Sequence, residues 1–152
     1  MALRFIWTDG ENEAFRHFHE VTEAYYSRIA GGEENRKGFI PYNLSSAVED
    51  VLVVYREDRA VACAGLKRYS AADAEIKRVW VEPDCRNMHI ATLMMARIEE
   101  KALDRGYKRT VLQTREIMRD AVGLYAKLGY HRIENYPPYD KLEGAVCFAK
   151  VL

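Results

Sequence analysis

Residues 74–92, which read AEIKRVWVEPDCRNMHIAT, constrain the fold more strongly than any other stretch of the chain. Over residues 74–81, successive side chains alternate between two faces and several are β-branched, which predicts a strand. Pro83 and Asp84 end this strand, because proline cannot donate to a ladder and aspartate favours turns. From Ile90 onward, apolar side chains recur at helical spacing. The loop over residues 85–89 therefore joins a strand directly to the N-terminus of a helix.

A junction of this kind directs free backbone N–H groups and the positive end of a helix dipole at one point. It predicts an anion site that is best suited to phosphates. The chain has 23 basic and 23 acidic residues, so no net field favours nucleic acid or an anionic membrane. We therefore expect local geometry to hold an anionic ligand, and we expect neither nucleic acid nor a membrane as a partner.

Periodicity along the rest of the chain predicts further elements in a definite order. Strands are expected over residues 3–7, 51–55, 60–66, 108–114, 130–134 and 145–151. Helices are expected over residues 11–30, 90–105 and 119–128. Glycines end them: Gly31 and Gly32 the first, Gly106 the second and Gly129 the third. Residues 51–66 are typical of an antiparallel hairpin, and residues 74–114 of a right-handed parallel crossover. Residues 33–46 are either a packed loop or short helix that covers another part of the molecule, or a surface segment without such a role.

This order predicts an α/β fold, with a mixed central sheet of about seven strands and helices on both faces. The length of 152 residues favours one domain. Ligands of open sheets bind where a crossover joins parallel neighbours, so we expect the site at the end of the strand over residues 74–81. Cys63, Cys85 and Cys147 have no metal-ligand spacing, and we expect them to be buried thiols of a cytoplasmic protein without a metal.

The segments VEPDCRNMHIA, AVGLYAKLGY, HRIENY and CFAKVL, in this order of elements, resemble the GNAT superfamily of acetyl-CoA-dependent N-acetyltransferases. The resemblance covers essentially the whole chain and is strongest over residues 74–130. In that family, the loop after the fourth strand carries Arg/Gln-x-x-Gly-x-Gly/Ala, whose backbone amides hold the pyrophosphate of coenzyme A. Here Arg86 stands in the first position, His89 where the first glycine is usual, and Ala91 in the last.

The resemblance implies acetyl-CoA as the cosubstrate, with its pantetheine arm paired to the backbone of residues 79–81 as another strand would be. The coenzyme-binding residues that it implies are Val79, Trp80, Val81, Arg86, Asn87, Met88, His89, Ile90, Ala91, Thr92, Tyr125 and Lys127. Read without the family, Arg86 would be a solvated surface arginine and Lys127 a solvent-facing lysine.

His89 is a departure from the family pattern. A positive φ at this position costs a non-glycine residue about 1–2 kcal/mol, although histidine tolerates it better than most. We expect the loop to take a conformation that accommodates the side chain and still to point its N–H groups at the ligand. Histidine is also a base by type, but the position of His89 in the family pattern is beside the phosphates rather than the thioester.

Acetyl transfer requires that the amine lose a proton, that the thiolate leave and that a donor stabilise the oxyanion. By resemblance, Tyr125 in the segment LYAKLGY is the proton donor beside the sulfur, or else a core residue of its apolar helix face. Glu75, expected on the same face as Val79, is the candidate base, directly or through a water. The alternative for Glu75 is an exposed glutamate paired with Lys77 or Arg68. A backbone N–H near Val79 or Trp80 is expected to polarise the acetyl carbonyl.

Three functions follow from the resemblance. The first is an N-acetyltransferase that acts on a small amine or amino acid by direct attack in a ternary complex. The second is a protein acetyltransferase with an open acidic groove, and the third is a non-catalytic acyl-CoA-binding regulatory module. A homodimer that pairs through the edge of the late strands is also consistent with the family.

The acceptor site is expected to be framed by the loop after residues 108–114 and by residues 39–43 and 136–139. Arg115 and Met118 stand where relatives often have glycine and glutamine, so the acceptor is not inherited from the family. Arg115 is consistent with a carboxylated acceptor, and equally with an ion pair to Glu116 or Asp120.

Overall fold

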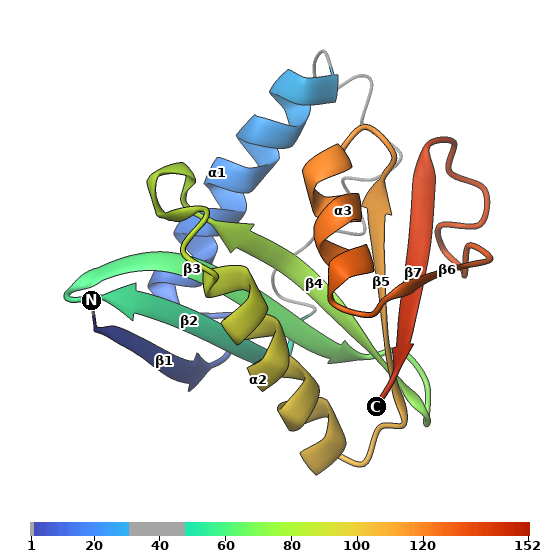
Figure 1. Ribbon diagram of the computed structural model, residues 1–152, viewed down its shortest axis with the longest axis horizontal. Helices are drawn as coiled ribbons and strands as arrows, with labels where there is room; N and C mark the ends of the chain where they lie inside the picture. The colour runs from blue at the N-terminus through green and yellow to red at the C-terminus, as the bar shows by residue number, and fades with distance from the viewer. Residues whose placement is uncertain (1, 31–47) are drawn as a thin grey trace.

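The computed structural model describes residues 2–30 and 48–152, which form a twisted seven-stranded sheet in the order β1-β2-β3-β4-β5-β7-β6 (Figure 1). The strands are β1 (Leu3–Thr8), β2 (Asp50–Arg56), β3 (Arg59–Arg68), β4 (Asp73–Val81), β5 (Arg109–Arg115), β6 (His131–Ile133) and β7 (Ala145–Val151). The helices are α1 (Glu13–Ala30), α2 (Ile90–Asp104) and α3 (Arg119–Lys127), with a short 3-10 helix at Pro83–Cys85.

The pairing of the strands confirms the predicted mixed sheet. Strands β1 to β4 form an antiparallel meander, β4 pairs with β5 in parallel through the crossover helix α2, and β7 pairs antiparallel with β5 and β6. The parallel ladder is short: it runs from Asp73 opposite Arg109 to Ile76 opposite Leu112. Beyond this point both strands continue without each other, so the sheet opens between them.

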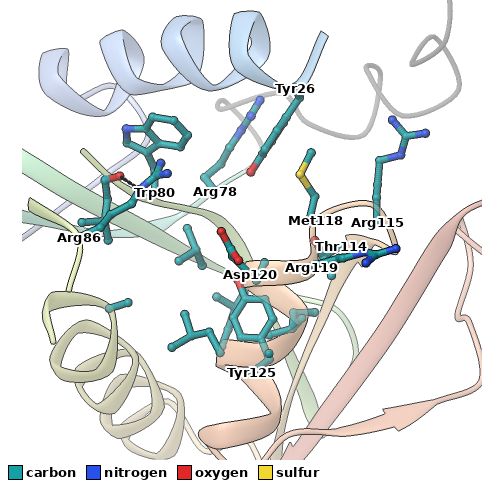
Figure 2. Close-up of a pocket in the computed structure, with 18 of the residues that line it drawn as sticks. Tyr26, Arg78, Trp80, Arg86, Thr114, Arg115, Met118, Arg119, Asp120 and Tyr125 are labelled. Atoms are coloured by element: carbon teal, nitrogen blue, oxygen red, sulfur yellow. Dashed lines mark hydrogen bonds between the residues drawn. The ribbon is translucent and has the colours of Figure 1, made fainter. Parts of the chain in front are cut away.

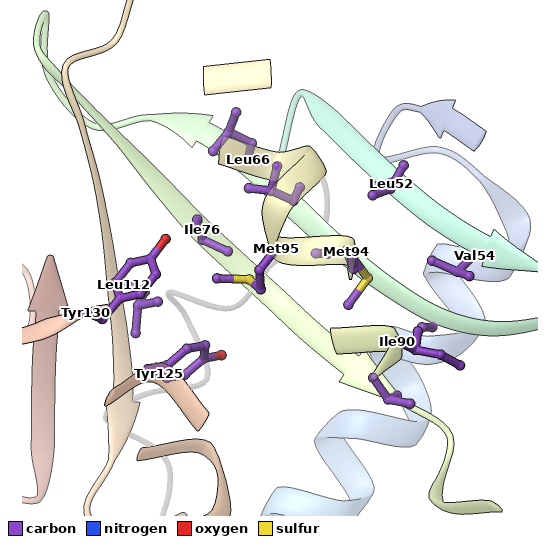
Figure 3. Packing of buried hydrophobic residues seen from close by; sticks show 14 of the residues in the cluster. Leu52, Val54, Leu66, Ile76, Ile90, Met94, Met95, Leu112, Tyr125 and Tyr130 are labelled. Carbon is purple, nitrogen blue, oxygen red and sulfur yellow. The ribbon is translucent and has the colours of Figure 1, made fainter. Parts of the chain in front are cut away.

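Helices cover both faces of the sheet, as the sequence predicts. Figure 1 shows α2 and α3 on one face and α1 on the other. The first face is filled by Ile90, Met94, Met95 and Ile98 of α2, which pack against apolar side chains of β2 to β5 (Figure 3). Burial of each such side chain contributes about 1.5–3 kcal/mol, so the helical spacing of these residues decides which side of α2 faces the sheet.

Helix α1 packs through Phe15 and Phe18 against Val51, Val53 and Trp80 on the opposite face. The helix begins at Glu13 rather than at the predicted residue 11. Asn12 provides the reason, because its side-chain oxygen accepts a hydrogen bond from the backbone N–H of Phe15 at 3.0 Å and so caps the helix. Gly31, Gly32 and residues 33–46 lie outside the described residues.

Strand β4 contains a bulge at Arg78, whose φ is 62°. The strand advances from Lys77 to Trp80 while its partner β3 advances only from Gly65 to Cys63. The extra residue reverses the alternation of faces. Ile76 and Val79, three residues apart, therefore both pack on the α2 face. The prediction that Glu75 shares a face with Val79 is wrong for this reason, because Glu75 lies on the opposite face from both.

Other local predictions are confirmed. Gly106 and Gly129 follow α2 and α3 with φ values of 90° and 93°, which glycine adopts without strain. The three cysteines are buried free thiols. Within residues 2–30 and 48–152, no helix combines the length and the apolarity that a membrane span requires.

Candidate active site

A cleft of about 1130 Å³ opens where β4 and β5 part. Its floor is formed by residues 75–81 of β4. Its walls are formed by α1, by the loop before α2 with the first turn of that helix, and by the segment from β5 into α3. In Figure 2, Trp80 and Arg86 lie on one side of the pocket, Arg115 and Met118 on the other, and Tyr125 projects from α3 below them.

One end of the cleft is formed by the junction between β4 and α2. His89 is the residue before α2 and has a left-handed backbone, with φ 61° and ψ 18°, and no side-chain cap is present. The first N–H groups of a helix have no partner within the helix, so those of residues 90–92 remain available to a ligand. His89, Ile90, Ala91 and Thr92 all line the cleft.

The expectation that this loop would adapt to His89 is wrong, because His89 keeps the positive φ that favours glycine. His89 is exposed and lines the cleft. The chain therefore accepts the conformational cost of a non-glycine residue, about 1–2 kcal/mol, and retains the loop geometry.

Eleven of the twelve residues that the family resemblance implies for coenzyme binding line the cleft. They are Val79, Trp80, Val81, Arg86, Asn87, His89, Ile90, Ala91, Thr92, Tyr125 and Lys127. Met88 does not line it; its side chain packs against the core beneath α2 instead.

Arg86 is exposed but held in place. Its Nε donates a hydrogen bond to the carbonyl oxygen of Val81 at 2.9 Å, and its guanidinium lies 4.9 Å from the centre of the Trp80 ring. A cation over an aromatic ring at an exposed site contributes about 0.5–1 kcal/mol. Arg86 therefore places a fixed positive charge at the end of the cleft that also holds the free helix N–H groups.

Tyr125 is part of the hydrophobic core and also lines the cleft. Its ring is 7% exposed and packs against Tyr130 and Phe148, with ring centres 6.0 and 6.4 Å away. Within the described residues, its hydroxyl has no hydrogen-bond partner. Burial, and to a smaller extent the neighbouring Tyr26, raises the pKa of Tyr125 well above its ordinary value, so the hydroxyl stays protonated at neutral pH.

Glu75 lies at the other end of the cleft and is only 3% exposed. Its Oε2 accepts a hydrogen bond from the Tyr136 hydroxyl at 2.8 Å. The alternative of an exposed strand glutamate is therefore wrong. Burial and the adjacent carboxylate both raise the pKa of Tyr136, which remains a hydrogen-bond donor to Glu75.

Lys77 also belongs to the candidate site, although the sequence suggests it only as a partner for Glu75. It lines the cleft, is 9% exposed, and donates a hydrogen bond from Nζ to the Tyr139 hydroxyl at 2.8 Å. Burial lowers the pKa of Lys77 to about 8. Its position in the strand at whose end the sequence predicts the ligand site was the available signal.

Arg115 and Met118 line the cleft, as the prediction of the acceptor site requires. Glu116 pairs with Arg132 at 3.1 Å. Tyr139 also lines the cleft, whereas residues 39–43, the other predicted frame of the acceptor site, lie outside the described residues.

Comparison with known proteins identifies the family. A model of the acetyltransferase (GNAT) family matches residues 7–130, which is most of the chain. The chain belongs to the GNAT acetyltransferase family. The junction between β4 and α2 and the cleft beside it are thus features of a GNAT domain, and the resemblance inferred from VEPDCRNMHIA and AVGLYAKLGY is confirmed.

Relatives of this GNAT protein are distant in sequence and similar in fold. An uncharacterized N-acetyltransferase of Schizosaccharomyces pombe is 27% identical over 89 residues, which are 57% of this chain. The match spans about half, 55%, of that relative. A Klebsiella pneumoniae structure described as a candidate acyl-CoA N-acyltransferase is 21% identical, covers 99% of this chain and 97% of that one, and gives a TM-score of 0.81.

A GNAT acetyltransferase structure from Elizabethkingia anophelis with acetyl-CoA bound is 20% identical, covers 76% of this chain and 83% of that one, and gives a TM-score of 0.61. At these identities, the structural matches confirm the GNAT fold and leave the acceptor of this GNAT protein open.

Proposed function

We propose that the protein transfers the acetyl group of acetyl-CoA to the primary amine of a small molecule or amino acid, by direct attack in a ternary complex. The observation that carries this proposal is the cleft between β4 and β5. It has free helix N–H groups at one end and a buried carboxylate, Glu75, at the other. One end suits a diphosphate and the other an ammonium group.

The coenzyme fits the first end in two respects. Backbone N–H groups between Arg86 and Thr92 would hold the pyrophosphate. On its β5 side, β4 has no ladder partner beyond Ile76 among the described residues, so the backbone of residues 79–81 is available to pair with the amides of the pantetheine arm. The thioester would then lie at the middle of the cleft.

The reaction there needs few groups. The free amine attacks the thioester carbonyl, and a backbone N–H near Val79 or Trp80 stabilises the oxyanion. Tyr125 donates a proton to the departing sulfur, which helps because a thiol has a pKa of about 8.5. Glu75 binds the ammonium group of the acceptor, directly or through a water, and promotes its deprotonation.

The charges of the cleft favour a small acceptor over a lysine-bearing protein chain. A groove that binds a basic peptide would be expected to be acidic. Among the described residues of the acceptor end, the ionisable side chains that line the cleft are Lys77, Arg115 and Arg119 against Glu75 and Asp120, while Arg78 is paired with Glu23 at 2.9 Å. This composition suits an acceptor that carries a carboxylate or other anionic group besides its amine.

The test has two steps. Thermal-shift measurements with acetyl-CoA and free CoA should show stabilisation, by about 2.7 kcal/mol at a ligand concentration of 100 Kd. Release of free thiol from acetyl-CoA is then measured across amino acids, small amines and lysine peptides. Release with small amines supports the proposal. Binding without release with any amine would indicate a non-catalytic acyl-CoA-binding module, and release with peptides alone a protein acetyltransferase.

A further inference from the structure

Lys77 places a primary amine inside the cleft, on the same face of β4 as Glu75. Two residues apart and before the bulge at Arg78, both side chains point to the α1 side of the sheet. The Nζ of Lys77 donates to the Tyr139 hydroxyl at 2.8 Å and lies 5.5 Å from the centre of the Tyr139 ring. Lysine is almost never fully buried unless its ammonium group has a role or a partner, so this position calls for a physical account.

The surroundings of Lys77 determine its protonation. Burial is the largest influence and lowers the pKa of its ammonium group to about 8, against the attraction of Glu75. Lys67 on β3 and Arg78 on β4 lower it further through like-charge repulsion. Tyr139, from the connection between β6 and β7, accepts the hydrogen bond of Nζ. The lowered pKa increases the share of Lys77 side chains that are neutral near neutral pH.

We propose that Lys77 accepts the proton that the acceptor ammonium group must lose, while Glu75 holds that ammonium group by its charge. This proposal rests on the proposed acetyltransferase function. The Oε2 of Glu75 already accepts a hydrogen bond from the Tyr136 hydroxyl at 2.8 Å, which fixes the carboxylate in position to hold an ammonium group. An efficient general base has a pKa near the working pH, and the amine of Lys77 meets this condition.

Each proton that moves in the proposed reaction has a donor and an acceptor. The acceptor R–NH3+ transfers one proton to the neutral Lys77 amine, which becomes an ammonium group. The free amine then attacks the acetyl carbon, so that a C–N bond forms and the C–S bond breaks. The thiolate receives one proton from Tyr125, which recovers one from the attached nitrogen. Lys77 finally releases its proton to solvent, and the products are the amide, free CoA and one proton.

Substitution of Lys77 by arginine separates this role from a purely electrostatic one. Arginine keeps the positive charge and can still donate to Tyr139, but it stays protonated throughout the accessible pH range. Lys77→Arg should lower kcat at least 100-fold and abolish the rise of kcat with pH near 8, while the thermal shift with free CoA persists. A Lys77→Arg enzyme within threefold of wild-type kcat would overturn the proposal and leave the acetyltransferase function intact.

A direct titration provides a readout without turnover. The lysine side-chain carbons are followed by NMR against pH in the free, full-length protein, and the Lys77 signal is assigned by its absence in Lys77→Arg. The expected midpoint is near 8. A midpoint near 10.5, the ordinary value for lysine, would overturn the proposal.

Lys67→Met is the matched control, because Lys67 is a neighbouring lysine that does not line the cleft. Loss of its positive charge should raise the pKa of Lys77 and move the rising limb of the kcat profile to higher pH, with the plateau rate unchanged. A limb that stays in place or moves to lower pH would overturn the assignment to Lys77. If wild-type protein releases no thiol with any amine, the acetyltransferase function itself fails.

Discussion

Tyr125 and Tyr130 pack against each other, but their hydroxyl groups differ in hydrogen bonding. The Tyr130 hydroxyl is bonded to the Thr110 hydroxyl at 2.8 Å and to Glu99 at 3.0 Å, and Tyr130 does not line the cleft. The Tyr125 hydroxyl has no such partner within the described residues and faces the cleft. Both tyrosines are buried, but Tyr130 has a structural role through its hydrogen bonds, whereas Tyr125 is the catalytic candidate.

Tyr125→Phe should lower kcat about 100-fold, because the departing thiolate loses its proton donor, with little change in the Kd of CoA or in stability. Steady-state kinetics and CoA titration measure the two effects. Tyr130→Phe is the control: it should lower the free energy of unfolding by about 1–3 kcal/mol and leave turnover near normal. Equal turnover in wild type and Tyr125→Phe would remove Tyr125 from the reaction.

His89→Gly should stabilise the protein by up to about 1 kcal/mol. Relief of the left-handed backbone provides about 1–2 kcal/mol, and the greater freedom of glycine in the unfolded chain removes part of this gain. Urea unfolding measures the change. Glu57→Gly, at φ 57° in the turn between β2 and β3, is a comparison at a residue that does not line the cleft. Loss of stability in His89→Gly would mean that the imidazole makes a stabilising contact in solution.

At the residue scale, the sequence predicted which residues line the site better than it predicted their hydrogen-bond partners. Tyr125 was chosen by the family resemblance, and Glu75 by the resemblance together with its place on the predicted strand; both line the cleft. The hydrogen bond from Tyr136 to Glu75 joins residues 61 positions apart, and that from Lys77 to Tyr139 joins residues 62 apart. Such contacts depend on how a long connection folds back over the sheet, which local periodicity does not specify.

At the scale of elements, the decisive feature is the sequence of strand β4, bulge and helix α2. The strand and the helix were predictable, because alternation and helical spacing are strong local signals. The bulge was not, since Arg78 is neither glycine nor asparagine and nothing in its neighbours marks a left-handed residue. One unpredicted residue was enough to place Glu75 and Val79 on opposite faces.

Ala91→Asp should abolish CoA binding while the helix survives. A carboxylate in the first turn of α2 is favourable for the helix dipole, so the unliganded melting temperature should not fall on electrostatic grounds. The same charge beside the free N–H groups would repel a pyrophosphate. Loss of the thermal shift with CoA is the expected result.

Leu93→Asp is the control for this variant, because Leu93 lies in the same turn, is 46% exposed and does not line the cleft. It should bind CoA as wild type does. Retained affinity in Ala91→Asp would show that the coenzyme binds elsewhere.

At the scale of the whole molecule, the order of elements was predictable and the boundaries were less so. Strand β6 covers only His131–Ile133, against a prediction of residues 130–134, because Tyr130 turns inward to bond with Thr110. The buried thiols were also predicted, and they report on the unfolding of the chain. Burial raises the pKa of Cys63 to about 12 and also raises the pKa of Cys147.

Labelling of the native protein with a thiol reagent at pH 8 should therefore be slow and should require opening of the fold. All three cysteines are buried at 1% exposure or less. Acetyl-CoA, which has no free thiol, should slow labelling about 100-fold at 100 Kd, because it binds the native state. Rapid labelling of one cysteine in the absence of denaturant would reveal a local opening near that residue.

The short parallel ladder between β4 and β5 also divides the molecule into two lobes, one built on β1 to β4 and the other on β5 to β7. A coenzyme bound in the opening would contact both lobes and restrict their motion relative to each other. Amide hydrogens on both sides of this seam should then exchange more slowly with deuterium once acetyl-CoA is bound. The bound cosubstrate would then supply contacts between β4 and β5 that the sheet itself lacks beyond the short parallel ladder.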